Sequence, residues 1–168
     1  IFRREGVNAA IIEGDSFHRY DRKAMREAVA AADKDGHSTF SHFGHEANLF
    51  EDLERLFADY AATGGGKRRR YLHDAAEAEP YKQDPGTFTA WEDVPASDLL
   101  YYEGLHGAVV HENTNIAKHP DLLIGVVPVI NLEWIQKLHR DRSMRGYSTE
   151  AVMDTVLRRM HDYVHYIC

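Results

Sequence analysis

Three short apolar runs along the chain predict β-strands. They cover residues 7–13, 98–102 and 122–130. Within each run apolar residues follow one another, without a strict alternation of apolar and polar positions. Such runs are typical of strands in a parallel sheet that is covered on both faces. The pattern therefore predicts an α/β fold.

Segments with apolar residues at helical spacing lie between and after these runs. The predicted helices cover residues 22–33, 46–60, 131–142 and 150–167. Ser148 or Thr149 would cap the last of them. Residues 1–6 are typical of a last helical turn that ends at Gly6, whereas the polar segment 63–95 predicts loops and short strands.

Length and charge limit the class of protein. The 168 residues suffice for a hydrophobic core, and we expect a single domain over residues 1–168. The 20 Lys and Arg residues against 27 Asp and Glu residues give a net charge of −7, which argues against nucleic-acid binding. No apolar stretch approaches the length of a membrane span, and the single cysteine, Cys168, cannot form a disulfide within the chain. We therefore expect a cytoplasmic protein that binds neither nucleic acid nor a membrane.

An acidic residue follows each of the first two predicted strands, where parallel α/β proteins bind their ligands. Asp15 comes just after the first strand, and Glu103 follows the second with a glycine behind it. Asp15 has the chemistry of a general base or a metal ligand, and Glu103 occupies the place of a carboxylate that holds Mg²⁺ in P-loop enzymes. A cap for the next helix is an equally good interpretation of Asp15 from the local pattern.

Cationic and aromatic side chains accompany these acids. His18 and Arg22 follow Asp15 at spacings that would let them bind an anion. Tyr71 and His73 lie on one face of segment 68–74 if that segment is extended, where they would line a pocket. A structural pair is an equally good interpretation of Tyr71 and His73.

A second cationic cluster lies between two predicted helices, in residues 137–147. It contains Lys137, Arg140 and Arg145 together with the carboxylate of Asp141. Arginine side chains bind phosphate oxygens in pairs, and a hinged basic loop is typical of a kinase lid. A solvated charged turn is the alternative, and most charge runs are of that kind.

Two further patterns predict no function. The GGGK run at 64–67 is followed by Arg68 and lacks a preceding buried strand, so it is not a G-x-x-x-x-G-K-[ST] phosphate loop. We interpret it as a turn. His37, His42 and His45 have neither cysteine nor an H-E-x-x-H motif beside them, and we therefore do not interpret them as zinc ligands.

Taken together, the motifs resemble the bacterial phosphoribulokinase family of P-loop kinases. The resemblance rests on EGDSFHRYDR at 13–22, TFSHFGHEAN at 39–48, YYEGLHG at 101–107 and VVPVINLEWIQKLHRDRSMRGY at 126–147. It implies a P-loop NTPase-like, mostly parallel sheet flanked by helices. It also implies transfer of the γ-phosphoryl group of MgATP to the C1 hydroxyl of D-ribulose 5-phosphate. The product, ribulose 1,5-bisphosphate, is the CO₂ acceptor of the Calvin cycle.

The resemblance assigns roles to individual residues. Asp15 matches the general base and Glu103 the acid associated with Mg²⁺, so that either carboxylate is a candidate ligand of the metal. The positions that match sugar-phosphate ligands are His18, Arg22, Tyr71, His73 and Arg145. Lys137, Arg140 and Asp141 match a lid group that acts on the transferring phosphoryl group. Arg4 matches an arginine of a binding site for the activator NADH, and bacterial family members are typically octamers.

Family members carry a glycine-rich ATP-phosphate loop on the N-terminal side of the position that matches Ile1. The resemblance therefore implies that this chain is an internal piece of a kinase, and we expect the 168 residues alone to be inactive and marginally folded. A uridine-kinase-like enzyme and a non-catalytic relative without the loop are the alternatives. His18, Arg22, His73 and Arg145 favour a phosphorylated acceptor over a nucleoside.

Overall fold

The computed structural model describes residues 1–36, 40–126, 129–143, 146–158, 160–162, 164 and 166. The chain divides into two compact units, Ile1–Leu123 and Ile124–Cys168. The first unit holds the strands and most of the core, and the second is helical.

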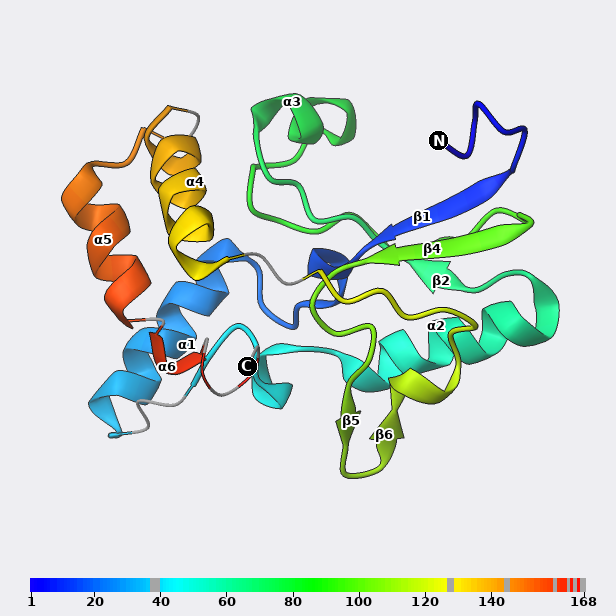
Figure 1. Ribbon diagram of the computed structural model, residues 1–168, viewed down its shortest axis with the longest axis horizontal. Helices are drawn as coiled ribbons and strands as arrows, with labels where there is room; N and C mark the ends of the chain where they lie inside the picture. The colour runs from blue at the N-terminus through cyan, green and yellow to red at the C-terminus, as the bar shows by residue number, and fades with distance from the viewer. Residues whose placement is uncertain are drawn as a thin grey trace. The chain divides into compact units, whose positions relative to one another are not determined.

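A pair of parallel strands organises the first unit (Figure 1). β1 (Ala9–Glu13) pairs with β4 (Leu99–Glu103), and Glu13 lies opposite Glu103 at the carboxyl end of the pair. Parallel neighbours require a long crossover, which here includes two α-helices, α1 (Arg22–Lys34) and α2 (Phe50–Thr63). The α/β prediction, the first two strands and the first helix are confirmed.

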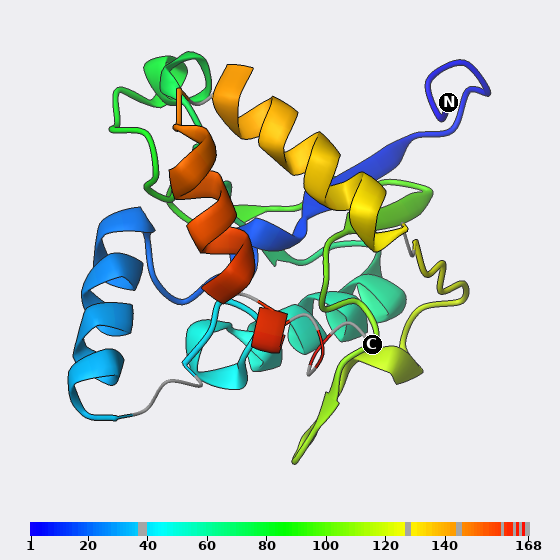
Figure 2. The same ribbon diagram turned by 60° about the vertical axis from the view of Figure 1, so that its left-hand side comes forward.

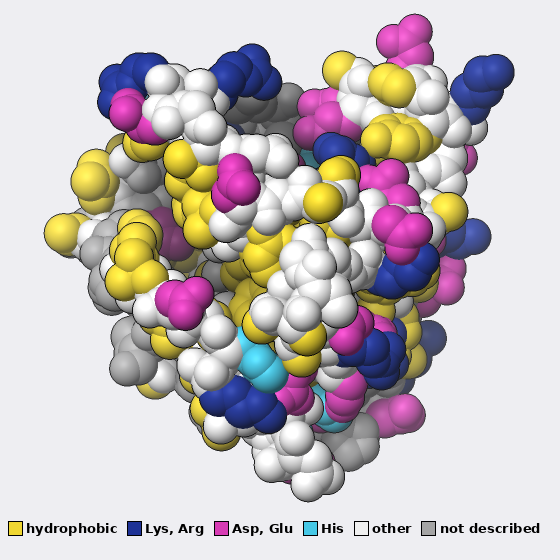
Figure 3. Space-filling view, turned by 90° about the vertical axis from the view of Figure 1, so that its right-hand side faces the viewer, with side chains coloured by type: hydrophobic (Ala, Val, Ile, Leu, Met, Phe, Trp, Pro, Cys, Tyr) yellow, Lys and Arg dark blue, Asp and Glu magenta, His cyan; other side chains and the backbone are white. Residues whose placement is uncertain are grey.

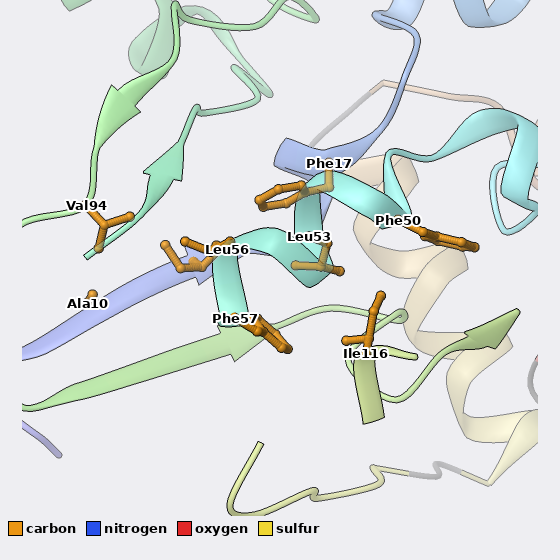
Figure 4. Close-up of a cluster of buried hydrophobic side chains, with 9 residues drawn as sticks. Ala10, Phe17, Phe50, Leu53, Leu56, Phe57, Val94 and Ile116 are labelled. Atoms are coloured by element: carbon orange, nitrogen blue, oxygen red, sulfur yellow. The ribbon is translucent and has the colours of Figure 1, made fainter. Parts of the chain in front are cut away.

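One face of the strand pair packs on α2 and forms the core (Figure 4). Ile12 and Leu53 are almost fully buried there, with exposed fractions of 1% and 0%. The predicted start of the helix at Glu46 is wrong, because His45–Ala47 forms a separate 3-10 turn before α2. Gly64 is the C-terminal cap of α2, and its φ of 73° is the left-handed conformation that favours glycine. The first glycine of the GGGK run therefore ends this helix.

The other face of the strand pair is open. Ile11 is 54% exposed, and Leu99 and Tyr101 are also exposed. Figure 3 shows hydrophobic side chains open to solvent among charged ones on the face that it draws. The prediction that both faces of the sheet are covered is therefore wrong for these residues, because a run of consecutive apolar residues does not by itself reveal how many layers cover it.

Short elements complete the first unit. The antiparallel pairs are β2 (Lys67–Arg68) with β3 (Glu92–Asp93), and β5 (Val110–His111) with β6 (Thr114–Asn115). The remaining helical turns are η1 (Gly14–Phe17), η2 (His45–Ala47), α3 (Ala75–Ala78), η3 (Glu79–Tyr81) and η4 (Ile116–Lys118). Figure 2 shows the β5–β6 hairpin projecting away from the β1–β4 pair. Within residues 63–95, the short strands β2 and β3 and the turns α3 and η3 largely follow the prediction of loops and short strands.

The second unit contains α4 (Ile130–Ser143), α5 (Thr149–Arg158) and α6 (Met160–Asp162). Ser148 caps α5, because its hydroxyl accepts a hydrogen bond from the Ala151 amide at 3.2 Å. The strand predicted over 122–130 is wrong: the described residues 122–126 and 129 form no strand, and α4 begins at Ile130. A strand needs a hydrogen-bonded neighbour, and this apolar run pairs with no described strand.

No helix in the described ranges is both long and apolar enough to cross a membrane.

Candidate active site

Two acidic turns meet at the carboxyl end of the strand pair. β1 continues from Glu13 into η1, which carries Asp15, and β4 ends at Glu103. The backbones touch behind these acids, since a Cβ placed on Gly14 would lie 2.9 Å from the Cα of Gly104. Glycine is required at this crossing because a larger residue would push the two turns apart.

Asp15 lies between two histidines. Its Oδ1 is 3.3 Å from His18 Nε2, and its Oδ2 is 3.8 Å from His73 Nε2. The hydrogen bond from His18 and the neighbouring histidine charges hold the pKa of Asp15 below its usual value, although desolvation acts in the opposite direction. The carboxylate of Asp21, not that of Asp15, caps α1 by accepting from the Ala24 amide at 2.8 Å. The alternative interpretation of Asp15 as a helix cap is therefore excluded.

Arg22 and Tyr71 complete this cluster. Arg22 Nη2 donates to the carbonyl oxygen of His73 at 2.7 Å, and its guanidinium lies 5.9 Å from the centre of the Tyr71 ring. The Tyr71 and His73 rings contact each other edge to face at 4.9 Å. The structure thus brings together five residues that the sequence singled out: Asp15, His18, Arg22, Tyr71 and His73.

Arg69 is a residue of this site that sequence reasoning missed. Its Nε donates to the carbonyl oxygen of Ser16 at 2.8 Å, and its Nη2 donates to that of His18. The guanidinium lies over the Phe88 ring, 3.7 Å from the ring centre. Desolvation by burial lowers the pKa of Arg69, which still leaves it a cation. Arg69 therefore links the turn that carries Asp15 and His18 to the segment that contains Arg69 itself. Nothing in the sequence distinguishes Arg69 from the other three basic residues of the run at 67–70.

Tyr102 and His106 lie behind the acidic turns. The Tyr102 hydroxyl lies next to Gly14 and Gly104. Burial raises the pKa of this hydroxyl above its usual value. His106 is 6% exposed, its Nε2 donates to the Phe43 carbonyl oxygen at 3.2 Å, and its ring is 4.9 Å from that of Phe50. Desolvation lowers the pKa of His106 to about 4, so this histidine is a neutral structural side chain at pH 7.

Lys137, Arg140 and Asp141 form a compact charged group in the second unit. Lys137 Nζ is 2.8 Å from Asp141 Oδ2, and Arg140 Nε is 3.1 Å from Asp141 Oδ1. Burial of Asp141 opposes its ionisation, but the hydrogen bonds from Lys137 and Arg140 outweigh that effect and keep its pKa below the usual value. The three residues lie on α4, which confirms the helix predicted over 131–142 and shows that the basic loop does not begin at Lys137. The i to i+4 pair of Lys137 and Asp141 favours continuation of the helix.

Two other predicted residues, Arg4 and Glu103, are exposed. Arg4 is exposed and pairs with its neighbour Glu5 at 2.7 Å. Glu103 is exposed at the end of β4. Arg145 lies outside the described residues. Within the described part of the chain, no three or more His, Cys, Asp or Glu side chains are grouped so that they could hold a metal ion.

Parallel strands that end in acidic turns, with a carboxylate between two histidines, are typical of the ligand-binding edge of an α/β enzyme. The model of the Phosphoribulokinase / Uridine kinase family matches residues 1–168, and the chain belongs to this family. Its relatives include the plasmid phosphoribulokinase of Cupriavidus necator, 66% identical over 100% of this chain, and that of Nitrobacter vulgaris, 63% identical over 100%.

A solved structure supports the same assignment. The phosphoribulokinase from Rhodobacter spheroides has a TM-score of 0.82 and 56% identity, over 99% of this chain and 58% of that one. The P-loop kinase fold predicted from the sequence is confirmed. The chain spans 58% of the length of the curated relatives that it matches.

Proposed function

We propose that the full-length protein that contains this chain transfers a phosphoryl group from ATP to the C1 hydroxyl of D-ribulose 5-phosphate. The product is ribulose 1,5-bisphosphate, the CO₂ acceptor of the Calvin cycle. The observation that carries this proposal is the ionised carboxylate of Asp15 between His18 and His73. Identities of 55–66% to proteins named phosphoribulokinase support the choice of acceptor.

Asp15 acts as the general base. Its lowered pKa leaves the carboxylate ready to accept a proton at neutral pH. The C1 hydroxyl oxygen of the sugar bonds to the γ-phosphorus, its proton passes to Asp15, and the bond between that phosphorus and the β,γ-bridging oxygen breaks to release ADP. Most of the rate enhancement in such reactions comes from positioning and from stabilisation of charge, which the surrounding cations supply.

The neighbouring side chains bind the sugar phosphate. His18, Arg22 and His73 offer nitrogen donors, and Tyr71 adds an aromatic face and a hydroxyl. We assign Arg145 to the same anion, because a guanidinium suits the oxygens of a phosphate. A nucleoside has no phosphate for this set to bind, so the set favours a phosphorylated acceptor over uridine.

The nucleotide side uses the other charged residues. Mg²⁺ in kinases is held by one or two carboxylates together with phosphate oxygens, and Asp15 and Glu103 are carboxylates of that kind at one end of the strand pair. When bound, the ion neutralises charge on the nucleotide phosphates. Lys137 and Arg140 stabilise the transferring phosphoryl group, and Asp141 keeps both cations in place.

The wider properties of the protein follow the same family. We infer that NADH activates the enzyme through a site that includes Arg4, that the protein forms octamers, and that it acts in the cytoplasm. Arg4 is exposed and therefore accessible to a ligand. Activation by NADH that is lost in the Arg4→Ala variant, together with an octameric mass in solution, is the expected result. An unchanged NADH response in that variant would remove Arg4 from the activator site.

The test of the acceptor is a panel measured on the full-length protein with MgATP. Ribulose 5-phosphate should be phosphorylated, and ribulose, ribose 5-phosphate and uridine should react far more slowly. Preferential phosphorylation of uridine would instead establish a uridine-kinase-like enzyme. ATP turnover with none of these acceptors would contradict both assignments.

Asp15→Asn tests the base. It should lower kcat by a factor of about 10²–10⁴, with little change in unfolding free energy, because the amide keeps the shape of the carboxylate but cannot take a proton. Asp21→Asn is the matched control, since asparagine also caps helices, and its turnover should equal that of the wild type. Near-normal turnover of Asp15→Asn would refute the role of Asp15.

A further inference from the structure

Asn48 is buried beside the acceptor-binding cluster, with an exposed fraction of 1%. Its Nδ2 donates to the carbonyl oxygens of His42 and Gly44, at 2.8 Å and 2.7 Å. Because a carbonyl oxygen can only accept, the amide nitrogen must face these two groups. The orientation of the Asn48 side chain is therefore fixed by its own loop.

The same orientation turns the amide oxygen of Asn48 toward His18. Asn48 Oδ1 lies 2.7 Å from His18 Nδ1, and an amide oxygen can only accept a hydrogen bond. Nδ1 of His18 must therefore carry a proton. A β-bridge between the two residues fixes their backbones, flanked by hydrogen bonds from Leu49 N to Phe17 O at 2.8 Å and from Arg19 N to Ala47 O at 2.7 Å.

The opposite edge of the His18 ring presents Nε2 to Asp15. We propose that Asn48 is a positioning residue, which holds the His18 ring in one orientation with a proton on Nδ1, so that the N–H group at Nε2 faces the base and the bound acceptor. This inference rests on the proposed function for the role of the acceptor, but its structural part concerns only Asn48 and His18. Asn48 itself touches none of the carboxylates proposed for catalysis in any described contact.

A double-mutant cycle on the full-length kinase tests whether Asn48 acts through His18. Asn48→Ala should lower kcat/KM for ribulose 5-phosphate about tenfold, as expected for loss of one buried hydrogen bond that orients an active-site group. In the His18→Gln background the same substitution should cost less than about twofold, because the group that it orients is already absent. Equal losses in both backgrounds would overturn the proposal.

Two further variants separate positioning from general damage to the loop. Ser41→Ala removes the hydroxyl that accepts from the Phe43 amide at 3.1 Å, so it perturbs the same loop without touching His18. Its kcat/KM should equal that of the wild type. Asn48→Asp keeps the acceptor toward His18 but loses both donors to the loop. It should be at least as unstable as Asn48→Ala, because a carboxylate oxygen would face the carbonyl oxygens of His42 and Gly44, yet it should recover most of the lost activity. An activity as low as that of Asn48→Ala would contradict the proposal.

The protonation state of His18 in the wild-type protein provides a readout that does not need turnover. With ¹⁵N-labelled histidine, and with His18→Gln to assign the signal, Nδ1 of His18 should carry a proton in the protein without substrate. An unprotonated Nδ1 would overturn the proposal. If the protein fails to phosphorylate ribulose 5-phosphate while Nδ1 is protonated, the proposed function fails and the structural role of Asn48 stands.

Discussion

His106 should make the stability of the protein fall as the pH drops below neutrality. The ring is buried against Phe50, and desolvation lowers its pKa from 6.5 to about 4 in the folded state. In the unfolded chain the ring is solvated and takes up a proton near the ordinary pKa. Between these two values the unfolded state binds more protons than the folded state, and stability therefore rises with pH across this window.

The size of the effect follows from the two pKa values. At about 1.4 kcal/mol for each pKa unit, a fall from 6.5 to about 4 corresponds to about 3 kcal/mol. The full stability is present above pH 6.5, and this amount is lost once the pH reaches about 4. At pH 4.5 the loss should be about 2.5 kcal/mol, a large share of the 5–15 kcal/mol that stabilises a typical domain.

Urea unfolding of the full-length protein at pH 7, 5.5 and 4.5 measures this loss. His106→Gln keeps a donor for the Phe43 carbonyl oxygen but has no group that titrates. The loss of unfolding free energy between pH 7 and 4.5 should therefore be about 2.5 kcal/mol smaller in this variant than in the wild type. The exposed His139 is the matched control, and His139→Gln should follow the wild type at every pH. If the curves for wild type and His106→Gln stay parallel from pH 7 to 4.5, the argument from burial is wrong.

Two predictions concern packing around the site. Gly14→Ala should lower the unfolding free energy by about 1–3 kcal/mol and reduce turnover, because the added Cβ would lie 2.6 Å from the Tyr102 hydroxyl. Gly65→Ala is the control, since a Cβ at that position would have its nearest neighbour at 3.7 Å. Equal stability of the two glycine variants would show that the strand ends are not in close contact. Leu53→Ala should cost about 2–5 kcal/mol in urea unfolding, since Leu53 is fully buried, and a cost below 1 kcal/mol would contradict the described core.

The parts of the fold that could be predicted are those that local patterns determine. The apolar run before Gly14 and the run before Glu103 became the paired strands β1 and β4. Since the carboxyl ends of parallel strands meet at one edge, the sequence also placed Asp15 and Glu103 at the same end of the pair. Residues 71–73 were predicted to place the Tyr71 and His73 side chains on one face. The edge-to-face contact between these two rings agrees with that prediction.

The wrong predictions arose where local pattern is ambiguous. The apolar run at 122–130 has the composition of a buried strand, yet its described residues 122–126 and 129 pair with no described strand. The start of α2 was placed too early because Glu46 continues the polar and apolar spacing of the helix. The backbone at Asn48 is extended, with φ −130° and ψ 157°, and this separates the turn at His45–Ala47 from the helix.

The residues that sequence reasoning missed act through contacts between distant parts of the chain. Asn48 reaches His18 across 30 positions, and Arg69 reaches the carbonyl oxygens of Ser16 and His18 across 53 and 51 positions. Most of the partners of Asn48 and Arg69 are backbone carbonyl oxygens, which every residue possesses and which leave no trace in the sequence. Single-sequence reasoning can therefore find a carboxylate that follows a strand, but not the side chains that orient its neighbours.

The acceptor-side residues Asp15, His18 and Arg22 are fixed by contacts within the first unit, to groups such as Asn48 and the His73 carbonyl oxygen. The cations proposed for the phosphoryl group belong to the second unit, where Asp141 pairs with both. Each group is thus held by its own unit before substrates bind. Substitutions at Asn48 should therefore act on the use of the sugar phosphate while leaving the binding of ATP unchanged.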